Sequence, residues 1–528
     1  MDQRSNFVYP NQTGSRKFVF VLCISFALIM LFQFLELPHH TMMSSFLSAK
    51  KLLPFSGKSF FLSKNSPSSS ANDTTKNDGF SLFHDQNVSS ISPAVYVNHS
   101  GLSSAPGGDS QTVVVTISEM NNLLLQSYSS LHSSQQQLTK PHSQVDIELF
   151  RIKEEIMNAP AVLSDVELYV SVYRNVSMFK RSYELMEENL KVYIYKDGEK
   201  PIFHSSILEG IYATEGWFLK LLEANKHFVT DIPTEAHLFY LPFSSRLLEL
   251  TLYVPHSHSR NNLIEYMKMY VDTLIGKYPF WNRTNGEDHF LAACHDWAPA
   301  ETRGKMANCI RGLCNADIRA GFVVGKDVSI PTTYVHSAKN PTEDNGGNPS
   351  SSERSILAFF AGQMHGRVRP ILVNYWGKDP DMKITGPIPH VKGDKSYIEY
   401  MKRSKYCICP RGFAVFSPRV VESNYGCVPV IISDDYVPPF FEALNWESFA
   451  VFVLEKEVVN LKRILLSISD EKYVEMERGV REVQKHFVWH AEPLKYDQFH
   501  MILHSMWYTR VFRTQNPPMN FSSANLKD

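Results

Sequence analysis

The sequence predicts an α/β protein with two doubly wound, Rossmann-like domains facing a cleft, preceded by a single transmembrane helix and a flexible stem. Three observations lead to this prediction. Residues 18–35 contain no charged side chain, residues 36–145 are rich in Ser, Asn, Gln and Thr, and the rest of the chain alternates short apolar strands with amphipathic helices. Such alternation is typical of mostly parallel sheets covered by helices.

The uncharged run at residues 18–35 is long enough for an uncleaved membrane anchor. As a helix it extends about 27 Å at roughly 1.5 Å per residue, which crosses a thin bilayer. Basic residues precede the run and Glu36 follows it, so the positive-inside rule predicts that residues 1–17 form a cytosolic tail and the remainder is lumenal. A cleaved signal peptide is the alternative, but the run exceeds a typical apolar core and no Ala-x-Ala-like site follows.

The polar composition of residues 36–145 predicts a flexible stem, because such a segment has too little apolar surface to offset the entropy of ordering. The globular part then divides at a polar stretch rich in Asn, Pro, Gly and Ser, residues 336–353, which reads as a linker. The sequence therefore predicts a first domain at residues 146–335 and a second domain, with closing helices, at 354–528.

Each domain shows the expected strand and helix signals. In the first, the predicted strands are 192–195, 237–243, 289–294 and 322–324, and the predicted helices are 212–224 and 262–278. In the second, the predicted strands are 356–360, 406–409, 428–432 and 450–454, and the predicted helices are 368–376, 397–405, 418–425, 458–468 and 471–488. Both sets fit a doubly wound sheet.

Six Asn-x-Ser/Thr sequons on the predicted lumenal side agree with this topology. They begin at Asn72, Asn87, Asn98, Asn175, Asn282 and Asn520. Of seven cysteines, six follow the anchor, three in each domain, where an oxidising compartment favours disulfides. Either one disulfide joins the two domains or each domain keeps a free thiol. No C-x-x-C is present, so zinc and redox sites lack support.

The charge balance argues against several classes of protein. Lys and Arg total 53 against 54 for Asp and Glu, so no global field attracts nucleic acid. The sequence contains no P-loop, no G-x-S-x-G and no H-E-x-x-H, so no motif indicates an ATPase, a serine hydrolase or a zinc protease.

The segment 407–433 (CICPRGFAVFSPRVVESNYGCVPVIIS) is the most informative about chemistry. A buried strand is predicted to end at a turn containing Arg411 and Gly412, and a helix to begin with Ser417 as its N-cap. Free N–H groups at such a helix start suit a diphosphate, and Arg411 and Arg419 could add charge-assisted hydrogen bonds.

Two further residues extend this candidate site. Glu422 shares a helical face with Arg419 and could accept from ribose or sugar hydroxyls, although an ordinary ion pair between the two is the alternative. The loop at residues 362–366 follows another predicted strand and leads into a helix that carries Arg369. This second strand-loop-helix turn is also suited to phosphate contacts.

Segment 407–433 resembles the donor-binding signature of the exostosin-like family, the family 47 glycosyltransferases. The resemblance covers nearly all of residues 185–455 and includes YPFWNRTNGEDHFLAACHDWAP and LCNADIRAGFVVGKDVSIP. The CHDWAP and WNR elements look most like the plant clade that includes xylogalacturonan xylosyltransferase. This sequence departs from the family pattern at Arg411, where serine is usual, at Asp317, where the clade has asparagine, and at Tyr425.

The resemblance implies a fold of the GT-B type, with an acceptor-side first domain and a nucleotide-sugar second domain in which Arg369 lies near the cleft. It implies inverting transfer of xylose, galactose, arabinose or glucuronic acid from a UDP-sugar to a plant cell-wall polysaccharide or oligosaccharide, with pectic polymers among the acceptors. It also implies a single-pass type II position in the Golgi membrane, with the catalytic part lumenal.

No cofactor beyond the UDP-sugar substrate is predicted. Asp379-Pro380-Asp381 matches the Asp-x-Asp string that holds a metal-bound nucleotide in some transferases. Its central proline and loop position favour metal-independent action, in which arginines offset the diphosphate charge, with a divalent metal as the alternative.

An inverting transferase needs a base that takes the proton from the acceptor hydroxyl. The stretch EDHFLAACHDW supplies Asp288, His289, His295 and Asp296 as candidates at a predicted strand and its carboxyl end. Asp288 is preferred, because Asp288 and His289 point to opposite faces of the strand and only one can face the cleft. Asp296 before Trp297 could instead cap a turn.

Two other functions compete with this prediction. One is a catalytically weak family member that serves as a non-catalytic subunit in a hetero-oligomer with other glycosyltransferases, which the departures at Arg411 and Tyr425 support. The other is a glycoside hydrolase, which needs a pair of carboxylates flanking the cleft that the sequence does not identify.

Overall fold

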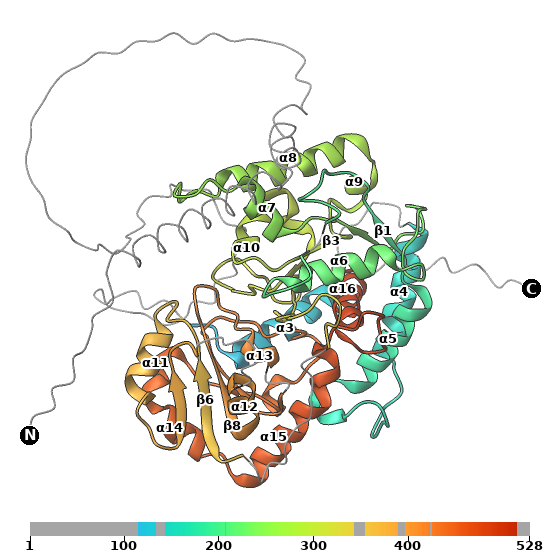
Figure 1. The fold of residues 1–528 in the computed structure, drawn as a ribbon. Helices are drawn as coiled ribbons and strands as arrows, with labels where there is room; N and C mark the ends of the chain where they lie inside the picture. Colours follow the sequence, from blue (N-terminus) through green and yellow to red (C-terminus); the bar gives the residue numbers. More distant parts are fainter. Residues whose placement is uncertain are drawn as a thin grey trace, which may run out of the picture. The chain divides into compact units, whose positions relative to one another are not determined.

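Two parallel sheets organise the chain in the computed structural model, which describes residues 114–133, 143–205, 207–342, 354–388, 396–422 and 425–514. All of these residues belong to one compact unit, Gly107–Asp528. In Figure 1 the first sheet lies among the green elements and the second among the orange ones. Two parallel sheets with covering helices confirm the predicted α/β class and are consistent with a GT-B-like fold.

The predicted anchor at residues 18–35 lies outside the described residues, as do the sequons at Asn72, Asn87, Asn98 and Asn520. None of the helices that the structure does describe is long and apolar enough to span a membrane. The remaining two sequon asparagines, Asn175 and Asn282, are exposed. Asn175 also caps α5 (Val176–Asn189), because its side chain accepts from the N–H of Met178 at 3.1 Å.

The first sheet is parallel throughout and follows the order of the chain. Its strands are β1 (Val192–Ile194), β2 (Leu238–Tyr240), β3 (His289–Ala293), β4 (Ile310–Leu313) and β5 (Val328–Ser329). All residues of β2, β3 and β4 are buried, as expected of strands covered by helices on both faces. Helix α6 (Ala213–Ala224) packs on β3, and α8 (Asn261–Lys277) packs on the short helix α9 (Phe280–Thr284).

The second sheet has the strand order β10-β9-β8-β6-β7 and is also parallel. Its strands are β6 (Ile356–Ala361), β7 (Met382–Thr385), β8 (Ser404–Pro410), β9 (Val428–Ile432) and β10 (Val451–Phe452). Its helices are α11 (Val368–Trp376), α12 (Ser396–Arg403), α13 (Arg419–Glu422), α14 (Leu461–Leu466) and α15 (Asp470–Val483). Strand β7 lies on one side of β6, whereas β8, β9 and β10 follow on the other side. The topological switch point therefore lies between β6 and β8, and in such sheets ligands bind there.

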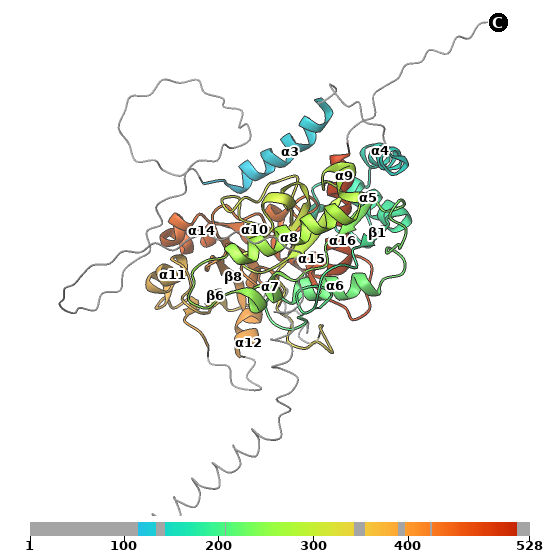
Figure 2. The same cartoon turned by 90° about the horizontal axis from the view of Figure 1, so that it is seen from above.

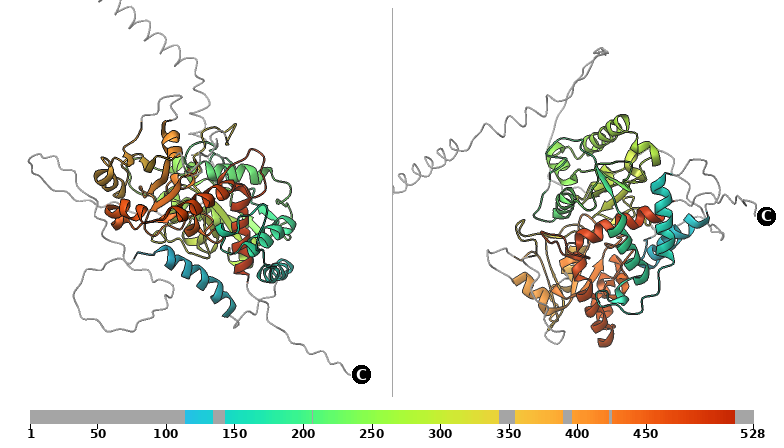
Figure 3. Two further views of the ribbon diagram at one scale, coloured as in Figure 1. Left: turned by 90° about the horizontal axis from the view of Figure 1, so that it is seen from below. Right: turned by 90° about the vertical axis from the view of Figure 1, so that its right-hand side faces the viewer.

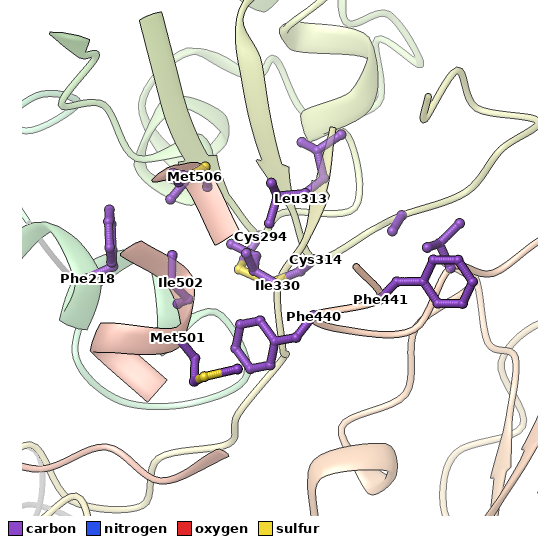
Figure 4. Packing of buried hydrophobic residues seen from close by; sticks show 14 of the residues in the cluster. Phe218, Cys294, Leu313, Cys314, Ile330, Phe440, Phe441, Met501, Ile502 and Met506 are labelled. Atoms are coloured by element: carbon purple, nitrogen blue, oxygen red, sulfur yellow. A yellow bond between two sulfur atoms is a disulfide. The ribbon is translucent and has the colours of Figure 1, made fainter. Parts of the chain in front are cut away.

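The last helix, α16 (Gln498–Arg513), belongs to the first sheet and corrects the predicted boundary of the second domain. It packs against β4, α6 and α4 (Gln144–Met157), as Figures 1 and 3 show. A Cβ on Gly312 of β4 would lie 2.4 Å from Cε of Met506, so the missing side chain makes room for the helix. Figure 4 shows Met501, Ile502 and Met506 in one cluster with Phe218 of α6.

Part of the predicted stem is folded against this unit. Helix α3 (Ile117–Ser133) buries Met120 and Leu124, and the ring of Tyr128 lies 5.3 Å from that of Phe512 on α16. Figure 2 shows α3 running along the outside of the unit. The prediction of a flexible stem up to residue 145 is therefore wrong for α3, because residues spaced by four form an apolar stripe within a Ser- and Asn-rich sequence.

Disulfides form within each half, which decides between the two predicted alternatives. Cys294 pairs with Cys314 and Cys407 pairs with Cys427, leaving Cys309 and Cys409 as buried free thiols. Each bridge closes a loop with a sequence separation of 20, which stabilises the fold by roughly 3 kcal/mol. The first bridge joins the carboxyl ends of β3 and β4 (Figure 4).

Candidate active site

Two arginines, Arg369 of α11 and Arg419 of α13, lie at the switch point of the second sheet and are called the arginine pair below. Arg369 donates to the carbonyl oxygens of Pro410 at 3.3 Å and Gln363 at 3.2 Å, and Arg419 donates to that of Ala361. Burial, and after it the charge of Arg419, lowers the pKa of Arg369 to about 10. Neither guanidinium forms an ion pair within the described residues, so the pair can bind an anion.

Buried polar groups and two glycines complete this cluster. The Ser417 hydroxyl and Nε of Arg419 are buried and have no hydrogen-bond partner in the described part of the chain. A Cβ on Gly362 would lie 2.5 Å from Nη2 of Arg419, and one on Gly412 would lie 2.8 Å from Nη2 of Arg369. The two glycines therefore let both loops close on the guanidiniums. Of the six residues predicted to bind the nucleotide sugar, the structure brings Arg369, Gly412 and Arg419 together, with Ser417 two residues before Arg419.

The helix that follows this loop is shorter than predicted. Helix α13 covers four residues, Arg419–Glu422, where the sequence predicted residues 418–425. Positive charge at the site therefore comes mainly from the arginine pair and loop N–H groups, because one helical turn has a small dipole. Glu422 is the last residue of α13, and its contact with ribose or sugar hydroxyls stays a prediction.

Asp296 follows β3 at the carboxyl end of the strand. The hydroxyl of Tyr212 donates to its Oδ1 at 3.2 Å. Burial raises the pKa of Asp296, and Tyr212, Arg246 and His365 counteract that rise only in part. His365 lies on the loop between β6 and α11, so a residue of each half contributes to the environment of this carboxylate.

Asn315, which the sequence analysis did not single out, joins Asp296 to the second half. Its Nδ2 donates to the backbone carbonyl of Asp296 at 2.8 Å, and its Oδ1 accepts from the N–H of Val415 at 3.3 Å. Asn315 follows β4, and a polar residue at the carboxyl end of a parallel strand is the signal that could have identified it. It fixes the Asp296 backbone relative to the loop at residues 411–417, called the donor loop below.

Asp288 and His289 lie at the amino end of β3, whereas Asp296 lies beyond its carboxyl end. Asp288 precedes β3, is fully buried, and accepts from Arg283 at 2.5 Å, Thr284 at 2.6 Å and His289 at 2.7 Å. Nε2 of His289 bonds the Tyr195 hydroxyl at 2.8 Å. Burial raises the pKa of Asp288, but His289 and Arg283 outweigh burial and hold it well below its usual range. This position argues against the preferred prediction of Asp288 as the base, because it is closed to a substrate.

A buried carboxyl group lies just beyond Asp296 on α10 (Ala298–Glu301). Glu301 is hydrogen-bonded to the Ser245 hydroxyl at the start of α7 (Ser245–Leu252), while its Oε1 has no partner in the described residues. Burial raises the pKa of Glu301 to about 8, and the nearby carboxyl of Glu215 adds to the rise. The raised pKa favours the protonated form of this buried carboxyl group.

The contribution of Glu301 to the stability of the protein is expected to fall as the pH rises from the ordinary glutamate pKa toward 8. In this range the folded protein keeps the Glu301 proton that the unfolded chain releases, so the free energy of unfolding decreases by at most about 1.4 kcal/mol per pH unit. Glu301→Gln is expected to reduce this slope, as measured by urea unfolding between about pH 5 and 8. Glu265→Gln, at an exposed position paired with Lys268, is the matched control; equal slopes in both variants would contradict the assignment.

The predicted Asp-x-Asp string is engaged in a local ion pair. Asp379 and Asp381 both accept from Nζ of Lys462, at 2.8 and 2.7 Å, at the amino end of β7. Within the described ranges, no three His, Cys, Asp or Glu side chains gather in a way that could hold a metal ion.

Comparison with known proteins covers the same part of the chain. The family described as the exostosin GT47 domain matches residues 186–468. An Arabidopsis thaliana protein named “Probable glycosyltransferase” is 42% identical over 365 residues, 68% of this chain and 70% of the relative. A second of that name is 41% identical over 346 residues, 64% of this chain and 73% of the relative. An Oryza sativa subsp. japonica protein named “Probable glucuronosyltransferase GUT1” is 31% identical over 349 residues, 60% of this chain and 80% of the relative.

Proposed function

Since the chain belongs to the exostosin GT47 family and is a glycosyltransferase, we propose that it transfers a sugar from a UDP-sugar to a plant cell-wall polysaccharide with inversion. The arginine pair is the observation that supports a UDP donor. Two guanidiniums that have no acidic partner among the described residues, beside the Ser417 hydroxyl that is likewise unpaired there, match the charge and the acceptor oxygens of a diphosphate. The positive charge of the arginine pair can also offset the diphosphate charge in place of a divalent metal, which supports metal-independent donor binding.

Asp296 is the base in this proposal. Its carboxylate takes the proton of the acceptor hydroxyl as the acceptor oxygen bonds to C1 of the sugar. The bond between C1 and the β-phosphate oxygen breaks, and its electron pair leaves with UDP beside the arginine pair. The raised pKa of Asp296 suits this role, because a base works best when its pKa approaches the working pH.

The sugar and the acceptor follow from the resemblance and from the relatives. The rice relative is named a glucuronosyltransferase, so glucuronic acid stands beside xylose, galactose and arabinose as the transferred sugar. The proposed acceptor is a wall polysaccharide or oligosaccharide, with pectic polymers included, which binds the first half. The uncharged run at residues 18–35 supports a type II position in the Golgi membrane with the catalytic unit in the lumen.

A donor panel tests the activity. The full-length protein in detergent is incubated with each of the four UDP-sugars and with pectic and xylan oligosaccharides, and UDP release and product mass are measured. Turnover with one donor is expected. A folded protein without turnover on any donor would favour the alternative, a non-catalytic subunit in a complex with other glycosyltransferases.

Arg369→Ala and Arg419→Ala are each expected to raise the dissociation constant of UDP by about 10- to 100-fold, because each removes charged hydrogen bonds worth about 1.5–3 kcal/mol. Calorimetric titration with UDP measures the change without the need for turnover. Lys462→Ala, which removes a cation already paired with Asp379 and Asp381, is the matched control. Unaltered UDP affinity in both arginine variants would remove the pair from the donor site.

A further inference from the structure

Arg411 begins the donor loop, and its guanidinium faces one carboxylate from each half. Nη2 lies 3.3 Å from Oδ2 of Asp317, which follows β4, and Nη1 lies 3.6 Å from Oε1 of Glu455, which follows β10. The side chains of Asp317 and Glu455 are only 10% and 5% exposed, so water solvates their charges poorly and the ion pairs with Arg411 are weakly screened. Arg411 therefore differs from the arginine pair, because its guanidinium is already paired with two carboxylates.

Hydrogen bonds join the two halves beside this ion pair. The N–H of Ile318 donates to the carbonyl oxygen of Asp435 at 3.1 Å, and the N–H of Val437 donates to that of Ala316 at 3.0 Å. The backbone around Asp317 is thus held against the second half, and its carboxylate reaches Arg411 from a fixed position. Asn315 lies in the same stretch and bonds both Asp296 and the donor loop.

We propose that Asn315, Asp317 and Arg411 form an interdomain brace that fixes Asp296 relative to the donor loop. Arg411 is a positioning residue of this brace and makes no contact with the diphosphate. The inference rests on the proposed function, because it takes Asp296 as the base and the arginine pair as the donor site. Alignment of the base and the acceptor with C1 limits the rate of such a transfer, so a loosened brace lowers kcat more than it weakens donor binding.

Arginine suits this position for a geometric reason. A guanidinium is planar and presents several N–H donors, so one side chain can reach carboxylates on two different elements. A lysine in place of Arg411 would carry the same charge on a single nitrogen, so it would keep only part of the interaction with the two carboxylates. The predicted role of Arg411 as a diphosphate ligand would require it to leave both carboxylates.

A double-mutant cycle in the full-length protein tests the brace. Arg411→Ala and Asp317→Ala are each expected to lower kcat about tenfold while the dissociation constant of UDP stays within about twofold of the parent, and the double variant is expected to be no slower than either single one. Arg411→Lys is expected to recover part of kcat. The matched control is Arg367→Ala, which removes the other cation paired with Glu455 but touches only the second half, and it is expected to keep the parent kcat.

Two results would overturn the inference. One is a loss of UDP affinity in Arg411→Ala equal to that in Arg369→Ala, which would make Arg411 a donor ligand. The other is additive loss of kcat in the double variant, which would show that Arg411 and Asp317 act separately. Hydrogen exchange provides a readout that needs no activity, since the Ile318 and Val437 amides should exchange faster in Arg411→Ala. If the parent protein neither binds UDP nor transfers a sugar, the proposed function fails. If the Ile318 and Val437 amides of Arg411→Ala exchange as slowly as in the parent, the brace alone is refuted.

Discussion

Replacing Asp296 with asparagine is expected to lower the turnover number by about 10²- to 10⁴-fold, the usual contribution of a general base. The amide keeps the shape of the side chain and can still meet the Tyr212 hydroxyl, but it cannot take the acceptor proton. UDP affinity should be unaffected, because the arginine pair lies on the second half. Product formation under saturating donor and acceptor, together with UDP titration, measures both quantities.

Asp288→Asn is the informative comparison, because it changes the preferred candidate of the sequence analysis. It breaks the ion pair between the fully buried Asp288 and the partly exposed Arg283, and the loss of a buried hydrogen-bond acceptor typically destabilises a fold by about 1–3 kcal/mol. The expected result is a lower unfolding midpoint with turnover per folded molecule close to that of the parent. If Asp288→Asn abolished turnover in a stable protein and Asp296→Asn retained it, the base would have to be reassigned to Asp288.

Removal of α3 is expected to have a comparably large effect on folding. A chain that begins at residue 134 loses the buried side chains of Met120 and Leu124 and the packing of Tyr128 on α16. At about 1.5–3 kcal/mol for each large apolar side chain, the loss approaches the whole stability of a typical protein. We expect aggregation or a strongly lowered unfolding temperature, measured by thermal denaturation and size-exclusion chromatography.

A chain that begins at residue 107 is the control for this truncation, because it lacks the predicted anchor and most of the stem but keeps α3. It also keeps Val115, whose N–H donates to Oδ1 of Asp435 at 2.8 Å next to the carboxyl ends of β9 and β10. This chain is expected to unfold at the same temperature as the full-length protein. Equal stability of the two truncated chains would mean that α3 contributes nothing to the catalytic unit.

The strong strands and helices could be predicted from the sequence, whereas the weak ones could not. Continuous apolar runs predicted β6 and β9, and amphipathic spacing predicted α11 with its exact bounds. Strand β4 was missed because Arg311 and Gly312 interrupt its apolar pattern, and β5 because it has two residues. The predicted strand at 322–324 is instead irregular and leads into a turn, since Gly321 and Gly325 have positive φ and the carboxylate of Asp327 accepts from the N–H of Val323.

The two strand-loop-helix turns after β6 and β8 could likewise be recognised from local sequence, because each has its own glycine and its own arginine. Their spatial arrangement could not, because Gly362 of the first loop packs against Arg419 and Gly412 of the second loop packs against Arg369.

The choice among the candidate bases could not be made from the sequence. Asp288 and Asp296 stand before and after β3, and only the structure shows that Arg283 and Thr284 close Asp288 off from a substrate. Asn315 and Glu455 were missed because their partners lie far away in sequence, and a single sequence holds no signal for such contacts.

The position of α16 determines when the catalytic unit can fold during its biosynthesis. Its buried face supplies core to β4, α5 and α6, yet it is the last element of the described chain to leave the ribosome. The first half is therefore synthesised before the helix that covers it, although the amino-terminal part of a chain usually folds first. Apolar surface around β4 therefore stays uncovered until α16 has been synthesised, and such transiently exposed surface is prone to aggregation.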